Sequence, residues 1–339
     1  MANFTPRFIF AGLLQRDFLI LPSGQAVLDI PGGNALYATV GCMVWEPDCL
    51  PGILARVGED YPQTWIESFQ QRGIDTRGIN ILPQALDVRN FRAYTSREGF
   101  TSQDPVAHFA KHGLLFPRAL LGYSTQDNPL DSRIKLNDFA LRQSDLIDDY
   151  MDANAIHFCP MNYLSHSLLP ALLRQAAFTT ITLDPNPGYM NTTFWDDVPG
   201  IITGLTAFLP SERQLRNLFQ GRSEDLWEMI ETVASYGCEI VAVKRGEGGQ
   251  LLYDRAARAR YEISAYDSRT ADTAGAGSAF CGGFLAGYRR TYDPLQAVLF
   301  GNISASLVVE GSGPFYALDA LPGLAQARLD AISQMVRRV

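Results

Sequence analysis

The chain has 339 residues, of which 47% are hydrophobic and 19% are charged, and it carries a formal net charge of -8. This balance is that of a folded globular protein, and it excludes long disorder, collagen-like repeats and coiled coil as the main architecture. The basic residues form no continuous run, so we expect no nucleic-acid partner.

The longest apolar runs are short. They span Phe8–Leu14 and Ile201–Pro210, whereas a membrane-spanning helix needs about 20 apolar residues. The first run leads into Gln15-Arg16-Asp17 without a small-residue cleavage pattern, which favours a buried first strand over a signal peptide. The five cysteines are widely spaced and include no C-x-x-C pair, so we expect reduced thiols in a cytoplasmic protein without a membrane partner.

Apolar β-type runs alternate with helical patterns along the chain, which is typical of a parallel sheet covered by helices. In chain order, the predicted strands are 7–13, 155–158, 180–183, 207–209, 240–244 and 250–253. The predicted helices are 35–43, 61–72, 167–176, 211–219, 223–236 and 317–338, the last in two pieces. No internal repeat and no Pro- or Ser-rich linker divides the chain, so we expect an α/β fold with one main domain over residues 1–339.

Two stretches do not follow this alternation. Residues 14–31 carry two apolar runs around Pro22-Ser23-Gly24, which is a hairpin pattern, and the second stretch opens with the alternating residues Val88, Asn90, Arg92 and Tyr94. We expect both to form a small sheet that projects from the main body. A long irregular segment inside a compact domain is typical of a functional lid.

The segment 271–280 contains a glycine-rich turn, Gly275-Ala276-Gly277, ahead of a helix of small residues. Free main-chain N–H groups at such a helix start, together with about half a positive charge from the helix dipole, favour anion binding. Gly282, Gly283 and Gly287 weaken the helix, so their presence predicts close packing against another backbone. In the alternative interpretation, Ser278 is the N-cap of an ordinary loop-to-helix junction.

Several other known sequence patterns are incomplete or absent in this chain. Phe280 stands where the dinucleotide pattern G-x-G-x-x-G needs its third glycine, and the P-loop pattern is absent from the sequence. Ala276 and Phe280 replace both glycines of the hydrolase pattern G-x-S-x-G around Ser278. His108 and His112 have zinc-protease spacing, but Phe109 occupies the position of the glutamate.

Residues 272–277 resemble the D-T-x-G-A-G-D signature of the ribokinase-like, or PfkB, kinases of carbohydrates and nucleosides, in six of seven positions counting the free one. Further segments resemble the family in the same chain order: Asp17, Gly32-Gly33, Val57-Gly58-Glu59-Asp60, Asp184-Pro185-Asn186-Pro187 with Trp195, Lys244-x-Gly246-x-x-Gly249, and Gly301-Asn302. The resemblance therefore extends over nearly the whole chain.

The resemblance implies a three-layer α/β/α sandwich with a mostly parallel sheet and a small β lid, formed by segments of approximately 14–31 and 87–122. It also implies ATP, Mg²⁺ and phosphoryl transfer to a hydroxyl group of a small sugar or nucleoside. The anion hole would be formed by Gly275, Ala276 and Gly277. The acceptor would be bound by Asp17, Gly32, Gly33, Asn34 and Tyr37. The nucleotide would be bound by Lys244, Gly246, Gly249, Asp272, Thr273 and Asn302. Exposed lid edges often pair between subunits, so a homodimer through the lid is expected.

The sequence departs from the family at three places. Ser278 replaces the aspartate that acts as the base, and a positioned base contributes about 10²–10⁴-fold to the rate. Ser211 and Gln214 replace the N-x-x-E motif that helps to organise magnesium and phosphate, where Glu212 is the substitute candidate for a metal ligand. Tyr37 replaces an asparagine on the acceptor side, which predicts an acceptor with a flat or apolar part.

Three hypotheses follow. The first is a small-molecule kinase that is either slow or has lost a natural aspartate at position 278. The second is a non-catalytic nucleotide- or sugar-binding protein with a regulatory role. The third is a Rossmann-type oxidoreductase or another α/β enzyme, which nicotinamide binding would support.

Overall fold

A computed structural model describes residues 5–96, 99–125, 131–176 and 178–339, and a ten-stranded sheet runs through its centre. The strand order is β14-β13-β12-β11-β10-β9-β8-β1-β4-β5, parallel from β5 to β11 and antiparallel from β11 to β14. The strands are β1 (Phe8–Ala11), β4 (Gly52–Gly58), β5 (Ile79–Leu82), β8 (Ala155–Phe158), β9 (Thr180–Leu183), β10 (Ala207–Phe208), β11 (Ile240–Lys244), β12 (Gln250–Asp254), β13 (Ala259–Ile263) and β14 (Val336–Arg338).

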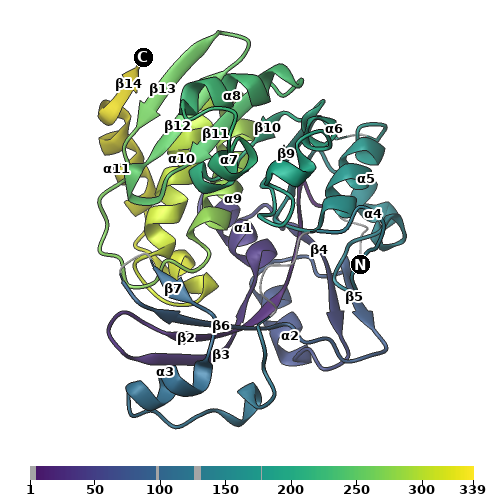
Figure 1. Ribbon diagram of the computed structural model, residues 1–339, viewed down its shortest axis with the longest axis vertical. Coiled ribbons are helices and arrows are strands. Elements are labelled where there is room, and N and C mark those ends of the chain that lie inside the picture. The colour runs from purple at the N-terminus through teal and green to yellow at the C-terminus, as the bar shows by residue number, and fades with distance from the viewer. Residues whose placement is uncertain (1–4, 97–98, 126–130, 177) are drawn as a thin grey trace.

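Helices cover both faces of this sheet (Figure 1). One face carries α1 (Asn34–Met43), α2 (Gln63–Gln71), α9 (Ala276–Thr291), α10 (Pro294–Val308) and α11 (Leu324–Ile332); the other carries α4 (Asp148–Met151), α5 (Tyr163–Leu173), α6 (Val198–Ile202), α7 (Glu212–Leu218) and α8 (Leu226–Ser235). Because side chains alternate along a strand, Phe8 and Phe10 of β1 enter one core and Ile9 and Ala11 enter the other. The predicted three-layer α/β/α arrangement is confirmed.

A separate four-stranded sheet forms the lid, in the order β3-β2-β6-β7. Its strands are β2 (Gln15–Ile20), β3 (Ala26–Gly32), β6 (Arg89–Tyr94) and β7 (Phe100–Thr101), and α3 (Pro105–Lys111) follows them. Figure 1 shows this sheet at the bottom of the molecule with α3 on its outer side. Both segments that break the α/β alternation thus meet in one lid, although residues 97–98 of the second lie outside the described part.

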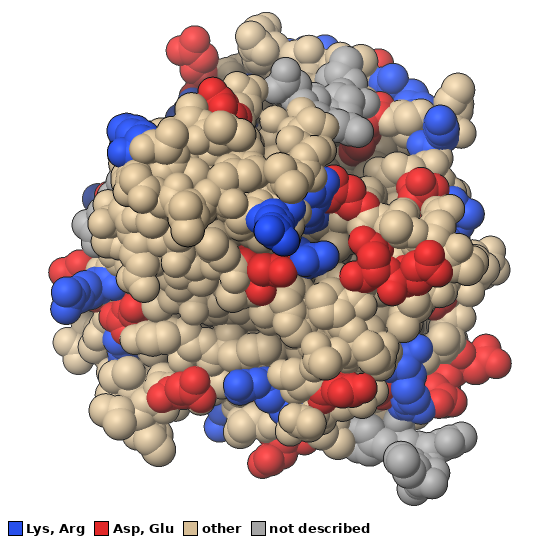
Figure 2. Space-filling view, turned by 90° about the horizontal axis from the view of Figure 1, so that it is seen from below, with Lys and Arg blue, Asp and Glu red and all other residues tan. Residues whose placement is uncertain are grey.

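The lid has two different faces. Phe18, Ile20 and Phe91 point outward into an apolar cluster with Phe109 of α3. Asp17, Asn90 and Tyr94 occupy alternate positions on the same strands and point inward, where they make the contacts described below. In the view from below, basic and acidic side chains are interspersed, and neither sign covers a continuous area (Figure 2).

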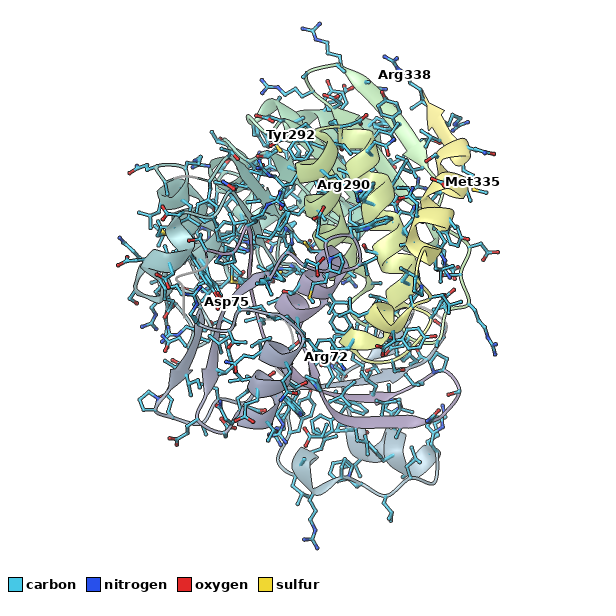
Figure 3. The ribbon with its side chains drawn as sticks, turned by 180° about the vertical axis from the view of Figure 1, so that it is seen from behind. Arg72, Asp75, Arg290, Tyr292, Met335 and Arg338 are labelled. Carbon is cyan, nitrogen blue, oxygen red and sulfur yellow. The ribbon has the colours of Figure 1, made fainter. Side chains whose placement is uncertain are left out.

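The C-terminal prediction is partly wrong. Residues 314–319 form a 3₁₀ helix and α11 follows, but Val336–Arg338 form an edge strand instead of the end of a helix. β14 pairs with β13, with Val336 opposite Ile263, and Figure 3 shows Arg338 at this edge. The open edge of the sheet supplies main-chain partners that a local helical pattern does not reveal.

Two helix starts also differ from the prediction. α5 begins at Tyr163 because Asn162 caps it, its side chain accepting from Ser165 N at 3.2 Å. α8 begins at Leu226 because the side chain of Asp225 caps it and accepts hydrogen bonds from Trp227 N and Glu228 N. No helix within the described ranges is long and apolar enough to cross a bilayer.

Candidate active site

The glycine-rich turn before α9 leaves main-chain amides open. Gly275 has a left-handed backbone with φ of 77° and precedes the first helical residue, Ala276. Ala279 N donates to Gly275 O at 2.8 Å, but within the described chain the amides of Gly275, Gly277 and Ser278 have no acceptor. The helix dipole adds about half a positive charge at this end. The turn is therefore suited to an anion, and Ser278 is the third residue of the helix and not its cap.

Close packing fixes the turn in place. A Cβ atom at Gly275 would lie 2.1 Å from the ring of Tyr37, and one at Gly282 would lie 1.7 Å from the carbonyl oxygen of Ala38. Both positions therefore require glycine, because α1 and α9 approach each other too closely for a side chain. This confirms the predicted backbone contact. Figure 3 shows Arg290 and Tyr292 at the opposite end of α9, away from the turn.

A buried ion pair faces the turn from the carboxyl ends of two parallel strands. Lys244 ends β11, Asp184 follows β9, and Lys244 Nζ lies 2.5 Å from Asp184 Oδ2. A Cβ atom at Gly277 would lie 3.7 Å from Lys244 Nζ, so the ammonium group is beside the open amides. Burial opposes the charge of Lys244, but Asp184 and Cys281 raise its pKa overall.

A cleft of about 1060 Å³ extends from this turn. Thr273, Ala276 and Gly277 line it, as do Ala305 and Ser306 of α10 and Val309, which follows that helix. Lys244 and Gly246 line it from β11 and the following turn, and Phe100 of the lid also reaches it. Crevices at the carboxyl ends of parallel strands are the usual ligand sites of open α/β sheets.

Two predicted nucleotide residues, Asn302 and Gly249, make different contacts near the cleft. Asn302 lines the cleft while its side chain donates to Gln250 Oε1 and Ser264 O and accepts from Tyr266 N, at 2.7, 2.8 and 2.9 Å. Gly249 has φ of 77°, and a Cβ atom there would lie 2.0 Å from Ile263 O. Asn302 therefore fixes the cleft wall through its hydrogen bonds, whereas Gly249 does not line the cleft and packs against the main chain of β13.

Asp272 connects the turn to the lid. Its Oδ1 accepts from Ala274 N at 2.8 Å and from the hydroxyl group of Tyr94 at 2.5 Å. Thr273 N donates to the same hydroxyl oxygen at 3.0 Å. Burial and the charge of Asp272 raise the pKa of Tyr94 to about 12. Asp272 thus supports the loop, and Tyr94 is a contact that sequence analysis missed; its only signal was the alternation along residues 88–94.

Two predicted acceptor-side residues, Asp17 and Gly32, lie on the lid strands β2 and β3. Asp17 is 2% exposed, and its Oδ1 accepts from Asn90 Nδ2 at 2.8 Å. Gly32 leaves room for this carboxylate, since a Cβ atom there would lie 2.0 Å from Asp17 Oδ2. Burial raises the pKa of Asp17, against the lowering effect of Arg92 on the same lid face. An inward carboxylate beneath the lid is suited to accept hydrogen bonds from hydroxyl groups.

The other acceptor-side residues make structural contacts. Gly33, with φ of 100°, precedes α1, and Asn34 accepts from Leu13 N and donates to Pro160 O, both at 2.8 Å. Tyr37 is 3% exposed, and among the described residues its hydroxyl group has no hydrogen-bond partner. Asn34 therefore holds the loop after β1, and Tyr37 packs α1 against the anion-binding turn.

The substituted N-x-x-E positions form a helix cap. Ser211 N donates to Gln214 Oε1 at 2.6 Å, and Gln214 N donates to Ser211 Oγ at 3.3 Å, which is a capping box for α7. Glu212 lines the cleft but accepts from Arg216 at 2.7 Å and from Arg245 at 3.2 Å. The carboxylate that was expected to help with a metal is thus already paired with two guanidinium groups.

Comparisons with known proteins find similar kinases. The chain is 25% identical over 286 residues to the cytidine kinase of Thermococcus kodakarensis, covering 83% of this chain and 88% of that protein. The structure of a fructokinase from Xylella fastidiosa with bound ATP has a TM-score of 0.68 at 18% identity, covering 97% of this chain and 99% of that one. The aminoimidazole riboside kinase of Salmonella enterica, complexed with aminoimidazole riboside and an ATP analogue, has a TM-score of 0.66 at 18% identity, covering 95% and 99%.

At these identities the two solved structures show the fold, which is ribokinase-like. The sequence profile of the pfkB family carbohydrate kinases matches residues 147–321, which is more than half of the chain and includes Asp184, Lys244 and the glycine-rich turn. By this match, the chain belongs to the pfkB family of carbohydrate kinases.

Proposed function

We propose that this chain transfers the γ-phosphoryl group of ATP to a hydroxyl group of a small sugar or nucleoside. One observation carries the proposal: the open amide of Gly277 lies beside Lys244, and both residues line the cleft. Amides and a cation placed in this way stabilise the charge on a transferring phosphoryl group.

In the proposed reaction, the bond between the γ-phosphorus and its bridging oxygen breaks and ADP leaves. The acceptor oxygen forms the new bond to phosphorus and releases its proton to solvent water. The hydroxyl group of Ser278 is a poor proton acceptor near neutral pH, and a positioned base contributes about 10²–10⁴-fold. Transfer depends mainly on positioning and on charge stabilisation, so we propose slow activity.

The described residues contain no preformed magnesium site. Glu212 is paired with two arginines and Asp184 with Lys244. Across the described ranges, no group of three or more His, Cys, Asp or Glu side chains could hold a metal ion. The proposal therefore assigns no step to a metal ion ligated by this chain.

The acceptor screen starts with cytidine. A relative that aligns with 83% of this chain is a cytidine kinase. Fructose and aminoimidazole riboside follow in the screen, since the similar solved structures are kinases of these compounds. We place the reaction in the cytoplasm, where ATP is available.

The first prediction concerns position 278. Ser278→Asp returns a carboxylate to the first turn of α9, and we expect it to raise phosphoryl transfer at least tenfold, as about 10²–10⁴-fold is available from a base. Ser278→Asn is the matched control, because its side chain has the same shape without a basic oxygen. Product formation from ATP and each acceptor is measured by chromatography. Equal rates in both variants would contradict the proposed role of this position.

A second candidate function is supported by the same position. A neutral hydroxyl at residue 278 and a helix cap at Ser211 and Gln214 agree with a non-catalytic nucleotide- or sugar-binding protein that regulates a partner. In that case ATP raises the melting temperature by mass action, but Ser278→Asp yields no product with any acceptor. If millimolar ATP gives no thermal shift, both functions are wrong.

A further inference from the structure

Arg92 is a basic side chain on the inner face of the lid. It lies on β6 between Asn90 and Tyr94, which point inward from alternate positions of the same strand. Its guanidinium carbon lies 4.7 Å from the centre of the Phe100 ring, and Phe100 lines the cleft. The positive charge of Arg92 therefore lies under the lid, between the acceptor side and the cleft.

The N–H donors of Arg92 are unused. Within the described ranges its guanidinium group forms no hydrogen bond and no ion pair. Arg16 and Arg89, on the same two lid strands, each form an ion pair with an aspartate instead. Burial raises the pKa of Asp17 and the charge of Arg92 opposes that rise, so the two groups lie near each other under the lid.

The carboxylates near Arg92 are held by other donors. Asp17 Oδ1 accepts from Asn90 Nδ2 at 2.8 Å, and Asp272 Oδ1 accepts from the hydroxyl group of Tyr94 at 2.5 Å. Neither carboxylate forms an ion pair with Arg92 in the described part of the chain. The two acidic groups thus act on its charge from a distance and leave its donors free.

A half-buried guanidinium group without a partner favours a ligand with negative charge. Arg92 is half-buried, so it loses part of its hydration, and this loss is recovered only when an acceptor faces its donors. A carboxylate or phosphate group offers two oxygens that match the guanidinium fork in two parallel hydrogen bonds. A neutral sugar offers only hydroxyl groups, for which Asp17 is already a suitable acceptor.

We propose that the acceptor carries an acidic group, a carboxylate or a phosphate, which Arg92 binds while Asp17 accepts from the hydroxyl groups. Asn90 lies opposite Asp17, and Arg92 follows two positions later on the same strand, at about 7 Å. The inference rests on the proposed function and narrows its acceptor to sugars with an acidic group. It makes Arg92 a specificity-determining residue and assigns it no contact with the nucleotide.

The experiment compares acidic compounds with neutral ones of matched shape. Gluconate is paired with glucitol, and glucose-6-phosphate is paired with glucose. Calorimetry measures the binding of each compound to the full chain without nucleotide. We expect the acidic member of at least one pair to bind about tenfold more tightly than its neutral partner, which is the usual effect of one charge-assisted contact. The pair that shows this preference tells a carboxylate from a phosphate.

Three variants connect the preference to Arg92. Arg92→Ala should bring the two members of the pair to within about threefold of each other, whereas Arg92→Lys should keep part of the preference because it keeps the charge and loses the planar fork. Arg118→Ala is the matched control, because Arg118 is an exposed arginine of the 3₁₀ helix Arg118–Leu120 and does not border the cleft. Melting temperatures check that each variant folds.

The inference is overturned if the neutral member binds as tightly as the acidic one in both pairs, or if Arg92→Ala keeps the full preference. If Arg92→Ala does not fold, Arg92→Lys decides, and a preference equal to that of the wild type overturns the inference. The proposed function fails separately, if no product forms from ATP with any acceptor although the acidic compound still binds.

Discussion

At the residue scale, the contacts of Tyr37 differ from the role that its position in the sequence predicts. The resemblance placed it on the acceptor side, and its position at the start of α1 agrees with that. Its ring, however, packs on Gly275, and its hydroxyl group is buried without a partner among the described residues. Such an unsatisfied group costs about 1–3 kcal/mol, so it is expected either to weaken the fold or to serve a ligand.

Tyr37→Phe distinguishes the two roles. The variant keeps the ring on Gly275 and removes the unsatisfied hydroxyl group, so the free energy of unfolding should stay constant or rise by about 1 kcal/mol. Urea denaturation measures this. A loss of stability would contradict the conclusion that the hydroxyl group is unpaired. A higher KM for the acceptor at unchanged stability would support the predicted acceptor contact.

Asp17 carries a stability cost that depends on pH. Burial raises the pKa of this carboxyl group above its ordinary value, so the wild type loses stability as the pH rises through the folded-state pKa. Asp17→Asn removes that charge, and we expect a gain of about 1 kcal/mol at pH 7, together with weaker acceptor binding. The gain should shrink as the pH falls through the pKa of Asp17. A difference in stability that does not change with pH would contradict this.

At the element scale, the side chain of Tyr94 joins the lid to the glycine-rich turn. Tyr94 of β6 contacts both Asp272 and Thr273, and Phe100 of β7 borders the cleft beside the turn. Asp17 on β2 belongs to the same sheet. Movement of the lid therefore affects the acceptor side and the nucleotide side together.

Tyr94→Phe removes the hydroxyl group and keeps the ring. A hydrogen bond to a charged group contributes about 1.5–3 kcal/mol, so we expect amide hydrogen exchange in β6 and β7 to become at least tenfold faster. Tyr123→Phe is the control for the amides of β7, since its hydroxyl group accepts from Phe91 N of β6 and does not reach the turn. Equal exchange in the two variants would show that Tyr94 does not hold the lid to the turn.

At the scale of the whole molecule, the lid offers one open edge for pairing. α3 and the apolar cluster around Phe109 cover its outer face, and β7 lies at the nucleotide cleft. β3 is the other end of the sheet order, and Leu28 on it is 37% exposed. A homodimer through the lid thus stays a prediction, and β3 is the edge strand through which we expect the two lids to pair.

Leu28→Lys tests this edge. A charge on an edge strand opposes pairing with a second strand, so sedimentation should show a dimer for the wild type and a monomer for the variant. Val106→Lys, on the exposed side of α3, is the control and should remain dimeric. A wild type that is monomeric at every concentration would rule out the lid dimer.

The sequence by itself determined the fold class, the strands at 155–158, 180–183 and 240–244, and the glycine-rich turn, because apolar periodicity and turn residues act over a few neighbouring positions. The tertiary structure alone decided that Val336–Arg338 is a strand, that Tyr94 contacts Asp272, and that Glu212 is paired with Arg245. These contacts join residues far apart in the chain, and their partners become neighbours only after the sheet and lid have assembled. The local signature predicted an anion site, but packing of distant segments decided which charged side chains lie near it.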